Sequence, residues 1–162
     1  MVVKSRPVDA SRLDLGYLAF FLGLRVNQLV LDRLRAAGFT RARESHGYVI
    51  QHLVEAERTI TELADRMEVT QQAASKAVAE LAALGIVELL PAPDRRAKVV
   101  RLSAEGVRVV QSGRQARLEI DVQLVNAIGK KQYTAAKAAL LTCLQTLGGI
   151  EPIRTRRIRQ PQ

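Results

Sequence analysis

The sequence predicts a mainly α-helical fold with one small β-hairpin. Apolar residues recur three or four positions apart over most of the 162 residues, which is the spacing of a helix face. They follow a strand-like pattern only in two short runs, 86–90 and 98–102. Aromatic residues make up 4% of the chain and Trp is absent, so Leu, Val, Ile and Ala must build the core. Ala and Leu favour helix.

The length and composition indicate one globular domain. Hydrophobic residues make up 48% and charged residues 25%, which is enough apolar material for a substantial core. No repeat and no Pro- or Gly-rich linker divides the chain. The single cysteine, Cys143, excludes an internal disulfide framework and a multi-cysteine zinc site.

The first predicted helix spans 12–37 and follows a short polar arm. Phe20, Phe21 and Leu24 widen its apolar stripe, so this helix must bury more than one side. Its most apolar run, 15–24, is shorter than the ~20 residues that cross a bilayer. We therefore expect no signal peptide, no membrane span and no membrane partner, and a location in the cytoplasm.

Three shorter helices follow. One covers 44–55, and the next begins at a capping box formed by Thr59 and Glu62, unless Thr61 is the cap. After a tight connection at Val69, Thr70 caps a further helix that runs through residue 84 and is closed by a glycine.

The periodicity then changes to that of strands. Residues 86–90 and 98–102 form the two strands of a hairpin whose turn, at 91–94, is rich in proline. Ser103 caps a long helix over 104–128, and a final helix covers 133–147 before a Gly-Gly stop. The tail, 150–162, is basic.

The net charge of +9, from 25 Lys and Arg against 16 Asp and Glu, points to a polyanionic partner. Two short helices joined by a tight turn and followed by a hairpin form a winged helix-turn-helix, whose second helix enters a DNA major groove. That helix would bury Ala74, Val78, Leu81 and Leu84, and its opposite face holds Gln71, Gln72, Ser75, Lys76 and Ala79. Gln bonds adenine edges, and Lys donates to guanine.

The hairpin tip adds a second basic element. Asp94, Arg95 and Arg96 lie at the turn and Lys98 beside it, and Arg is favoured in narrow minor grooves. Asp94 would orient an arginine or hold the turn backbone. Thr70 is added to these residues, because its hydroxyl and the helix N-terminus that it caps favour a phosphate. The complete predicted DNA-binding set is Thr70, Gln71, Gln72, Ser75, Lys76, Asp94, Arg95, Arg96 and Lys98.

Four segments together resemble the MarR family of bacterial transcriptional regulators: 61–64 (TELA), 69–76 (VTQQAASK), 80–88 (ELAALGIVE) and 94–106 (DRRAKVVRLSAEG). The resemblance implies a homodimer formed by helices in 12–37 and 104–149, with 44–103 as the DNA-binding lobe. It also implies a palindromic operator and a repressor role. The family's Asp-x-Arg wing pattern maps onto Asp94 and Arg96, and its recognition-helix pair maps onto Ser75 and Lys76.

The resemblance further implies a site for a small aromatic or phenolic effector, in a cleft among the first, second and fifth helices. The residues of the chain that fit such a site are Tyr17, Arg25, His46, Tyr48 and His52.

Other functions find less support in the residues. A metal-responsive regulator would use His46 and His52 with a carboxylate such as Glu55, but the six-residue spacing does not place both rings on one helix face. A winged-helix protein-interaction module would not need arginines at the hairpin tip. HExxH, GxSxG and phosphate-loop motifs are absent from the sequence, so we expect neither an enzyme nor a cofactor.

Overall fold

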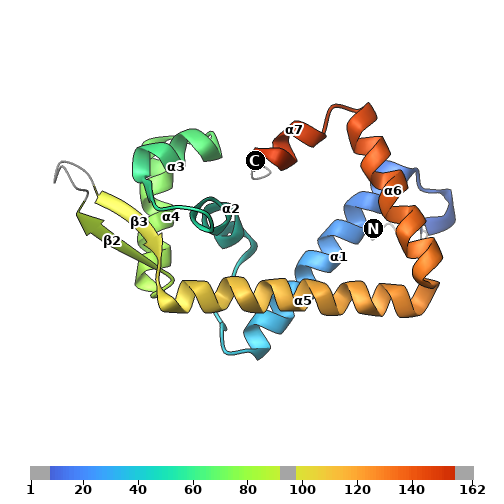
Figure 1. Cartoon of the computed structure of the whole chain (residues 1–162), viewed down its shortest axis with the longest axis horizontal. Helices are drawn as coiled ribbons and strands as arrows, with labels where there is room; N and C mark the ends of the chain where they lie inside the picture. The colour runs from blue at the N-terminus through green and yellow to red at the C-terminus, as the bar shows by residue number, and fades with distance from the viewer. Residues whose placement is uncertain (1–7, 92–97, 156–162) are drawn as a thin grey trace, which may run out of the picture.

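The computed structural model describes residues 8–91 and 98–155. A lobe of short helices and strands lies at one end, and the long helix α5 joins it to helices at the other end (Figure 1). The elements are η1 (Ala10–Arg12), α1 (Leu15–Ala36), α2 (Glu44–Leu53), β1 (Arg58–Thr59), α3 (Ile60–Met67), α4 (Gln71–Ala83), β2 (Val87–Pro91), β3 (Lys98–Leu102), α5 (Ala104–Ile128), α6 (Lys130–Thr146) and α7 (Ile150–Arg154).

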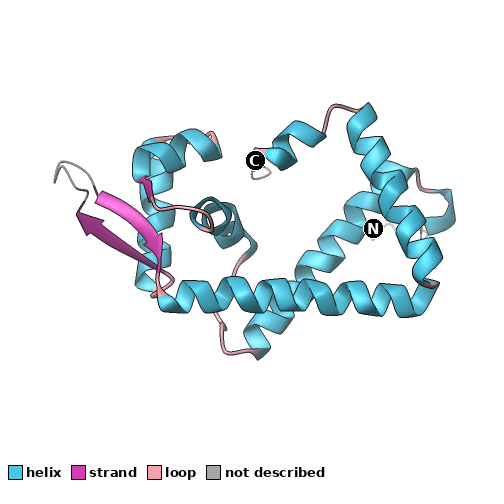
Figure 2. Ribbon diagram, in the orientation of Figure 1, coloured by secondary structure: helices cyan, strands magenta, loops and turns pink. Residues whose placement is uncertain are grey.

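The strands form one antiparallel sheet with the order β1-β3-β2 (Figure 2). In the hairpin Val87 pairs with Leu102 and Leu89 with Val100. The first strand of the hairpin begins one residue later than predicted, because Ile86 continues the turn that leaves α4 and donates its N–H to the Leu81 carbonyl. The third strand, β1, was not predicted, since two residues are too short to give an alternating pattern.

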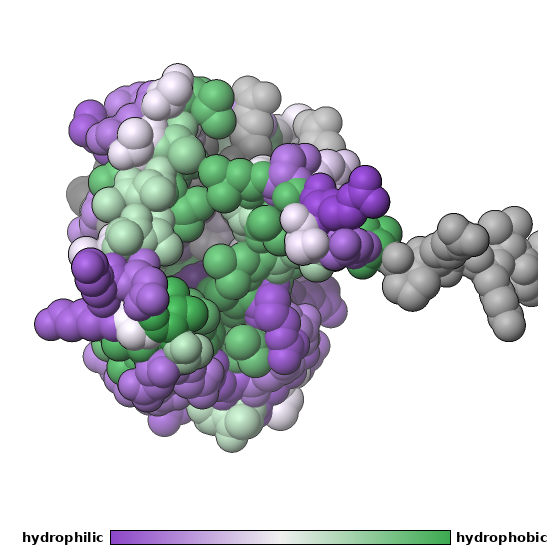
Figure 3. Space-filling model, turned by 90° about the vertical axis from the view of Figure 1, so that its right-hand side faces the viewer, coloured by the Kyte–Doolittle hydropathy of each residue, from purple (hydrophilic) through white to green (hydrophobic). Residues whose placement is uncertain are grey.

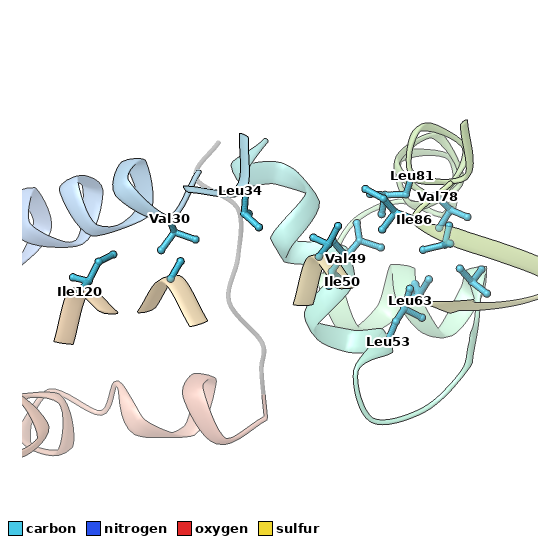
Figure 4. Close-up of a cluster of buried hydrophobic side chains, with 14 residues drawn as sticks. Val30, Leu34, Val49, Ile50, Leu53, Leu63, Val78, Leu81, Ile86 and Ile120 are labelled. Carbon is cyan, nitrogen blue, oxygen red and sulfur yellow. The ribbon is translucent and has the colours of Figure 1, made fainter. Parts of the chain in front are cut away.

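The core is one continuous cluster of aliphatic side chains that runs from the winged lobe to the crossing of α1 and α5 (Figure 4). In the lobe, Leu63 of α3, Leu81 of α4 and Val100 of β3 have no exposed surface. At its other end the cluster includes Val30 and Leu34 of α1 and Ile120 of α5. The second half of α1 is thereby fixed to the winged lobe through α5.

Side-chain caps set the starts of the helices. Thr59 caps α3 and forms the predicted capping box with Glu62, so Thr59 rather than Thr61 is the cap. Thr70 caps α4 and Ser103 caps α5, as predicted. Between α3 and α4 the chain turns through Glu68, which takes the left-handed conformation (φ 54°). This conformation produces the tight connection that the helix-turn-helix requires.

Three helix boundaries differ from the prediction by more than one residue. α1 begins at Leu15 rather than residue 12, because Asp14 is its N-cap and the Asp14 side chain accepts a hydrogen bond from the Tyr17 N–H. α2 ends at Leu53 rather than 55, and α6 begins at Lys130 rather than 133, directly after Gly129 with φ 83°. The predicted tail contains a short helix, α7, which follows the Gly-Gly turn.

The helices opposite the winged lobe bury little. All residues of α6 are described, and none of its side chains is buried. The first half of α1 likewise exposes large hydrophobic side chains, among them Tyr17, Phe20, Phe21 and Leu22. Figure 3 views the molecule from this end and shows hydrophobic side chains gathered in the middle of the face, with hydrophilic ones around them. None of the helices in the described ranges has both the length and the apolar character of a membrane span.

Candidate nucleic-acid interface and the adjoining cavity

The second helix of the helix-turn-helix, α4, has two distinct faces. Ala74, Val78 and Leu81 are buried as predicted, while Leu84, just beyond the helix, is only partly buried. The opposite face is exposed over all five predicted residues: Gln71, Gln72, Ser75, Lys76 and Ala79. α4 therefore presents to solvent a row of short and long polar side chains that can donate to or accept from a base edge.

The start of α4 is held by two side-chain hydrogen bonds. The hydroxyl of Thr70 accepts from the Ala73 N–H at 3.1 Å. The Gln71 amide nitrogen donates to the hydroxyl of Thr61, on α3, at 3.3 Å. Thr61, which the sequence left as an alternative cap, instead orients the first side chain of α4. The order of the two helices along the chain offered no way to predict this contact.

The wing is described at its root but not at its tip. Lys98 is exposed at the start of β3. The predicted tip residues Asp94, Arg95 and Arg96 lie outside the described residues. At the root, Arg101 forms an ion pair of 2.9 Å with Glu88, its direct partner across the hairpin. A second carboxylate, that of Glu57, lies 3.9 Å from Arg101. Pairing the two predicted strands residue by residue would have placed Glu88 opposite Arg101 and so predicted their ion pair.

Behind the winged lobe lies a cavity of about 430 Å³ among α1, α2, α5 and the segment 37–43. Its apolar wall includes Val30, Phe39, Ile50 and Val109. Its charged wall contains four arginines against two glutamates, namely Arg41, Arg43, Arg114, Arg117, Glu44 and Glu105. This combination suits a small molecule that has an apolar body and a negative charge.

Of the five predicted effector residues, His46 lines this cavity and the other four do not. Tyr17 and Arg25 are exposed on the first half of α1. Tyr48 is half-buried on α2, where burial and the nearby charge of Glu44 raise the pKa of its phenol and keep it protonated. His52 is buried on the same helix, with 3% of its surface exposed.

His46 belongs to a small polar cluster that connects the cavity to α4. It is 6% exposed, and its Nδ1 accepts from the N–H of Arg43 at 3.3 Å. Glu80 of α4 places Oε1 3.4 Å from Nε2 of His46 and 2.7 Å from Nη1 of Arg43. Sequence reasoning missed both Arg43 and Glu80, which lie 37 positions apart.

The metal hypothesis based on His46, His52 and Glu55 finds no support in the described part of the chain. Over residues 8–91 and 98–155, no three His, Cys, Asp or Glu side chains gather where they could hold an ion. His46 instead uses both of its ring nitrogens within the cluster with Arg43 and Glu80.

Comparison with known proteins points to one family. A family model described as the MarR family matches residues 37–97. No curated protein sequence matches the chain. The fold is similar to that of YusO from Bacillus subtilis, with a TM-score of 0.67, 18% identity, and coverage of 85% of this chain and 99% of that one. It is also similar to apo MarR from E. coli (TM-score 0.61, 21% identity, 82% and 98% covered).

A third similar structure contains nucleic acid. It is a mutant of MepR from S. aureus bound to an oligodeoxyribonucleotide, with a TM-score of 0.63 and 17% identity, covering 84% of this chain and 99% of that one. The order of the helices and the wing in the present chain is thus an arrangement found in three proteins of low sequence identity.

Proposed function

We propose that this chain, whose residues 37–97 match the model of the MarR family, is a sequence-specific DNA-binding transcriptional regulator that acts as a repressor. The observation that carries the proposal is the exposed polar face of α4 at Gln71, Gln72, Ser75 and Lys76. A helix of this kind reads base edges in the major groove.

The chemistry of the lobe supports this role. Lys76 can donate to guanine O6 and N7, and the glutamines can bond adenine. The N-terminus of α4, with Thr70 as its cap, favours a backbone phosphate. The formal charge of +9 attracts DNA over a longer range. Among the similar structures, the MepR mutant is bound to an oligodeoxyribonucleotide.

We further propose that the regulator is a homodimer held together by α1, α5 and α6. The support is the apolar surface that one chain leaves open. Phe20 and Phe21 of α1 are each more than half exposed, and so is Leu118 of α5. In α6, Leu141 and Leu144 are exposed as well. A soluble monomer rarely leaves an apolar surface of this extent uncovered, whereas a two-fold interface would bury it.

A two-fold dimer makes a geometric demand on the operator. The two copies of α4 would enter successive major grooves on one side of the duplex, about 34 Å apart. The operator would therefore be palindromic, with half-sites related by the same two-fold axis as the protein.

The cavity is the proposed site for an effector. It lies between the helices of the proposed interface and the winged lobe, and residues of α1, α2 and α5 line it. A small aromatic or phenolic anion bound there would shift the dimer away from the spacing that fits DNA if it binds the other lobe orientation more tightly.

The first test is retardation of duplex DNA in a gel at low salt. The regulator should retard random fragments weakly, and this binding should fall steeply with salt. A Lys76→Ala variant should bind a selected site less tightly and random DNA about as tightly as the parent. If the parent retards no DNA at low salt, the proposed function is wrong and a protein-interaction role takes its place.

A further inference from the structure

We propose that Glu80 couples the cavity to α4, the recognition helix, because its carboxylate competes with a bound anion for the guanidinium of Arg43. The ligand class is a small carboxylate with an apolar body. This inference rests on the proposed function, since it describes how occupation of the cavity reaches the helix that reads DNA.

The coupling begins with the position of the Glu80 carboxylate. Arg43 and His46 both line the cavity, whereas Glu80 does not. Glu80 reaches the same two side chains from α4, at 2.7 Å from Nη1 of Arg43 and 3.4 Å from Nε2 of His46. One carboxylate thus ties the start of α2 to the second half of α4, and the two cavity residues are its partners.

His46 fixes the geometry of this tie. Its Nδ1 accepts from the backbone N–H of Arg43, so in the neutral ring the proton sits on Nε2. That nitrogen then donates to Oε1 of Glu80. His46 is buried, and its ring is held by the backbone of its own helix. The His46 ring therefore stays in place when a ligand enters the cavity, and it continues to hold the carboxylate of Glu80.

Arg43 is the mobile partner. Two-thirds of its side chain is exposed (66%), so its guanidinium can turn between Glu80 and the cavity at little cost in packing. Of the four arginines that line the cavity, Arg117 is engaged by Asn27 of α1. Arg43, by contrast, forms its ion pair with Glu80 of α4.

The charge of the cavity wall decides the class of ligand. Four arginines face two glutamates, so an anion is favoured over a cation or a zwitterion. The aliphatic and aromatic wall, with Val30, Phe39 and Ile50, accepts an apolar body. A carboxylate matches the planar guanidinium of Arg43 as well as Glu80 does. When such a ligand binds Arg43, Glu80 loses this ion pair and keeps its contact with His46, so the polar connection between α4 and the start of α2 is weakened.

The direct test is calorimetric titration of the full chain with benzoate, and with benzamide as its neutral counterpart. The parent should bind benzoate and bind benzamide far more weakly. Glu80→Gln should bind benzoate more tightly, by about two- to fivefold, because the competing negative charge is gone. Arg43→Met should bind benzoate several-fold more weakly than the parent does.

A matched control separates competition from a general change in net charge. Glu119 is exposed to a similar degree as Glu80 and pairs with Arg33 at 3.2 Å, and neither of these residues lines the cavity. Glu119→Gln should bind benzoate as the parent does. Tighter binding by both glutamine variants would indicate a long-range charge effect and would overturn the assignment to Glu80.

The second part of the test measures DNA binding with and without benzoate. Benzoate should weaken retardation of DNA by the parent and have little effect on Glu80→Gln. The coupling is wrong if Glu80→Gln binds benzoate no more tightly than the parent, or if the parent ignores benzoate at about 10 mM. A parent that binds no DNA would refute the proposed function instead, and the calorimetric order of the variants would still test the competition.

Discussion

Gly106, in the first turn of α5, lies directly against the backbone carbonyl of Ile86, at the start of the wing. A methyl group at Gly106 would overlap that carbonyl oxygen and also press on the side chain of Leu102. The hydroxyl of Ser103 donates to the Ile86 carbonyl at 3.1 Å and accepts from the Gly106 N–H at 3.0 Å. The wing and the long helix are therefore joined at a point with no room for a side chain.

Gly106→Ala should destabilise the fold by about 1–3 kcal/mol, because backbone atoms must shift to admit the methyl group. The measurement is the free energy of unfolding by urea. Gly113 lies in the same helix with nothing near its absent side chain, so Gly113→Ala is the matched control. That variant should be neutral or stabilising by up to about 1 kcal/mol. Equal effects at the two glycines would disprove the close contact.

Thr59→Ala should lower the free energy of unfolding by about 1 kcal/mol, because the variant loses the cap of α3. The Thr59 hydroxyl accepts from the Glu62 N–H at 3.2 Å, and the Thr59 N–H donates to the Glu62 carboxylate at 2.7 Å. Thermal unfolding monitored by circular dichroism measures the loss. A melting temperature unchanged by the substitution would mean that this cap contributes nothing to stability.

The same cap predicts a pH dependence. The backbone N–H and then the hydroxyl of Thr59 hold the pKa of Glu62 below its usual value. Stability from this lowered pKa is fully present above the unfolded pKa, at about pH 4.3, and is lost as pH falls through the folded value. Glu62→Gln keeps a hydrogen-bonding side chain but does not titrate. The parent should be the more stable at pH 7, and its advantage should vanish on acidification; a constant difference would contradict the assignment.

The proposed dimer predicts an effect of charge on the apolar face of α1. Phe21 is 52% exposed in the single chain and packs edge-on against Phe20. Phe21→Glu would place a carboxylate in the interface, and light scattering should then give a mass near the 17.9 kDa of one chain. Val107→Glu is the control, because that side chain is similarly exposed near the wing end of α5. A parent that is already monomeric at micromolar concentration would refute the dimer.

Lys76→Ala tests whether α4 recognises DNA bases. The side chain is exposed in the middle of the polar face of α4. Its loss should cost about 1–3 kcal/mol on a selected site and relax the preference at one base pair in each half-site. Equal losses on selected and on random DNA, measured by fluorescence anisotropy, would assign Lys76 to a phosphate instead.

Much of the fold was predictable, because its elements are long or end at recognisable caps. The bounds of α5 follow from Ser103 and from the apolar periodicity, and the buried face of α4 follows from Ala74, Val78 and Leu81. Such patterns are local, so they are visible in a single sequence. β1 was missed because its two residues form a strand only by pairing with β3.

The candidate site was predictable only in part, for the same physical reason. The exposed residues of α4 belong to one helix face and could be read from their spacing. The tie between Arg43 and Glu80 depends on the packing of α2 against α4, and no local pattern predicts it. Tyr17 and Arg25 were placed in the effector cleft by analogy, yet the part of α1 that lines the cavity begins further along, at Asn27.

Selection of bound sequences from fragmented genomic DNA would show whether the protein recognises one DNA sequence as a two-fold dimer. We expect enrichment of one palindromic sequence, with half-site centres about 10 base pairs apart, because two copies of α4 would contact it about one helical turn apart. Lys76→Ala should lose preference at symmetric positions of that sequence. Recovery of no common sequence, or of a single asymmetric site, would contradict a two-fold dimer that reads bases through α4.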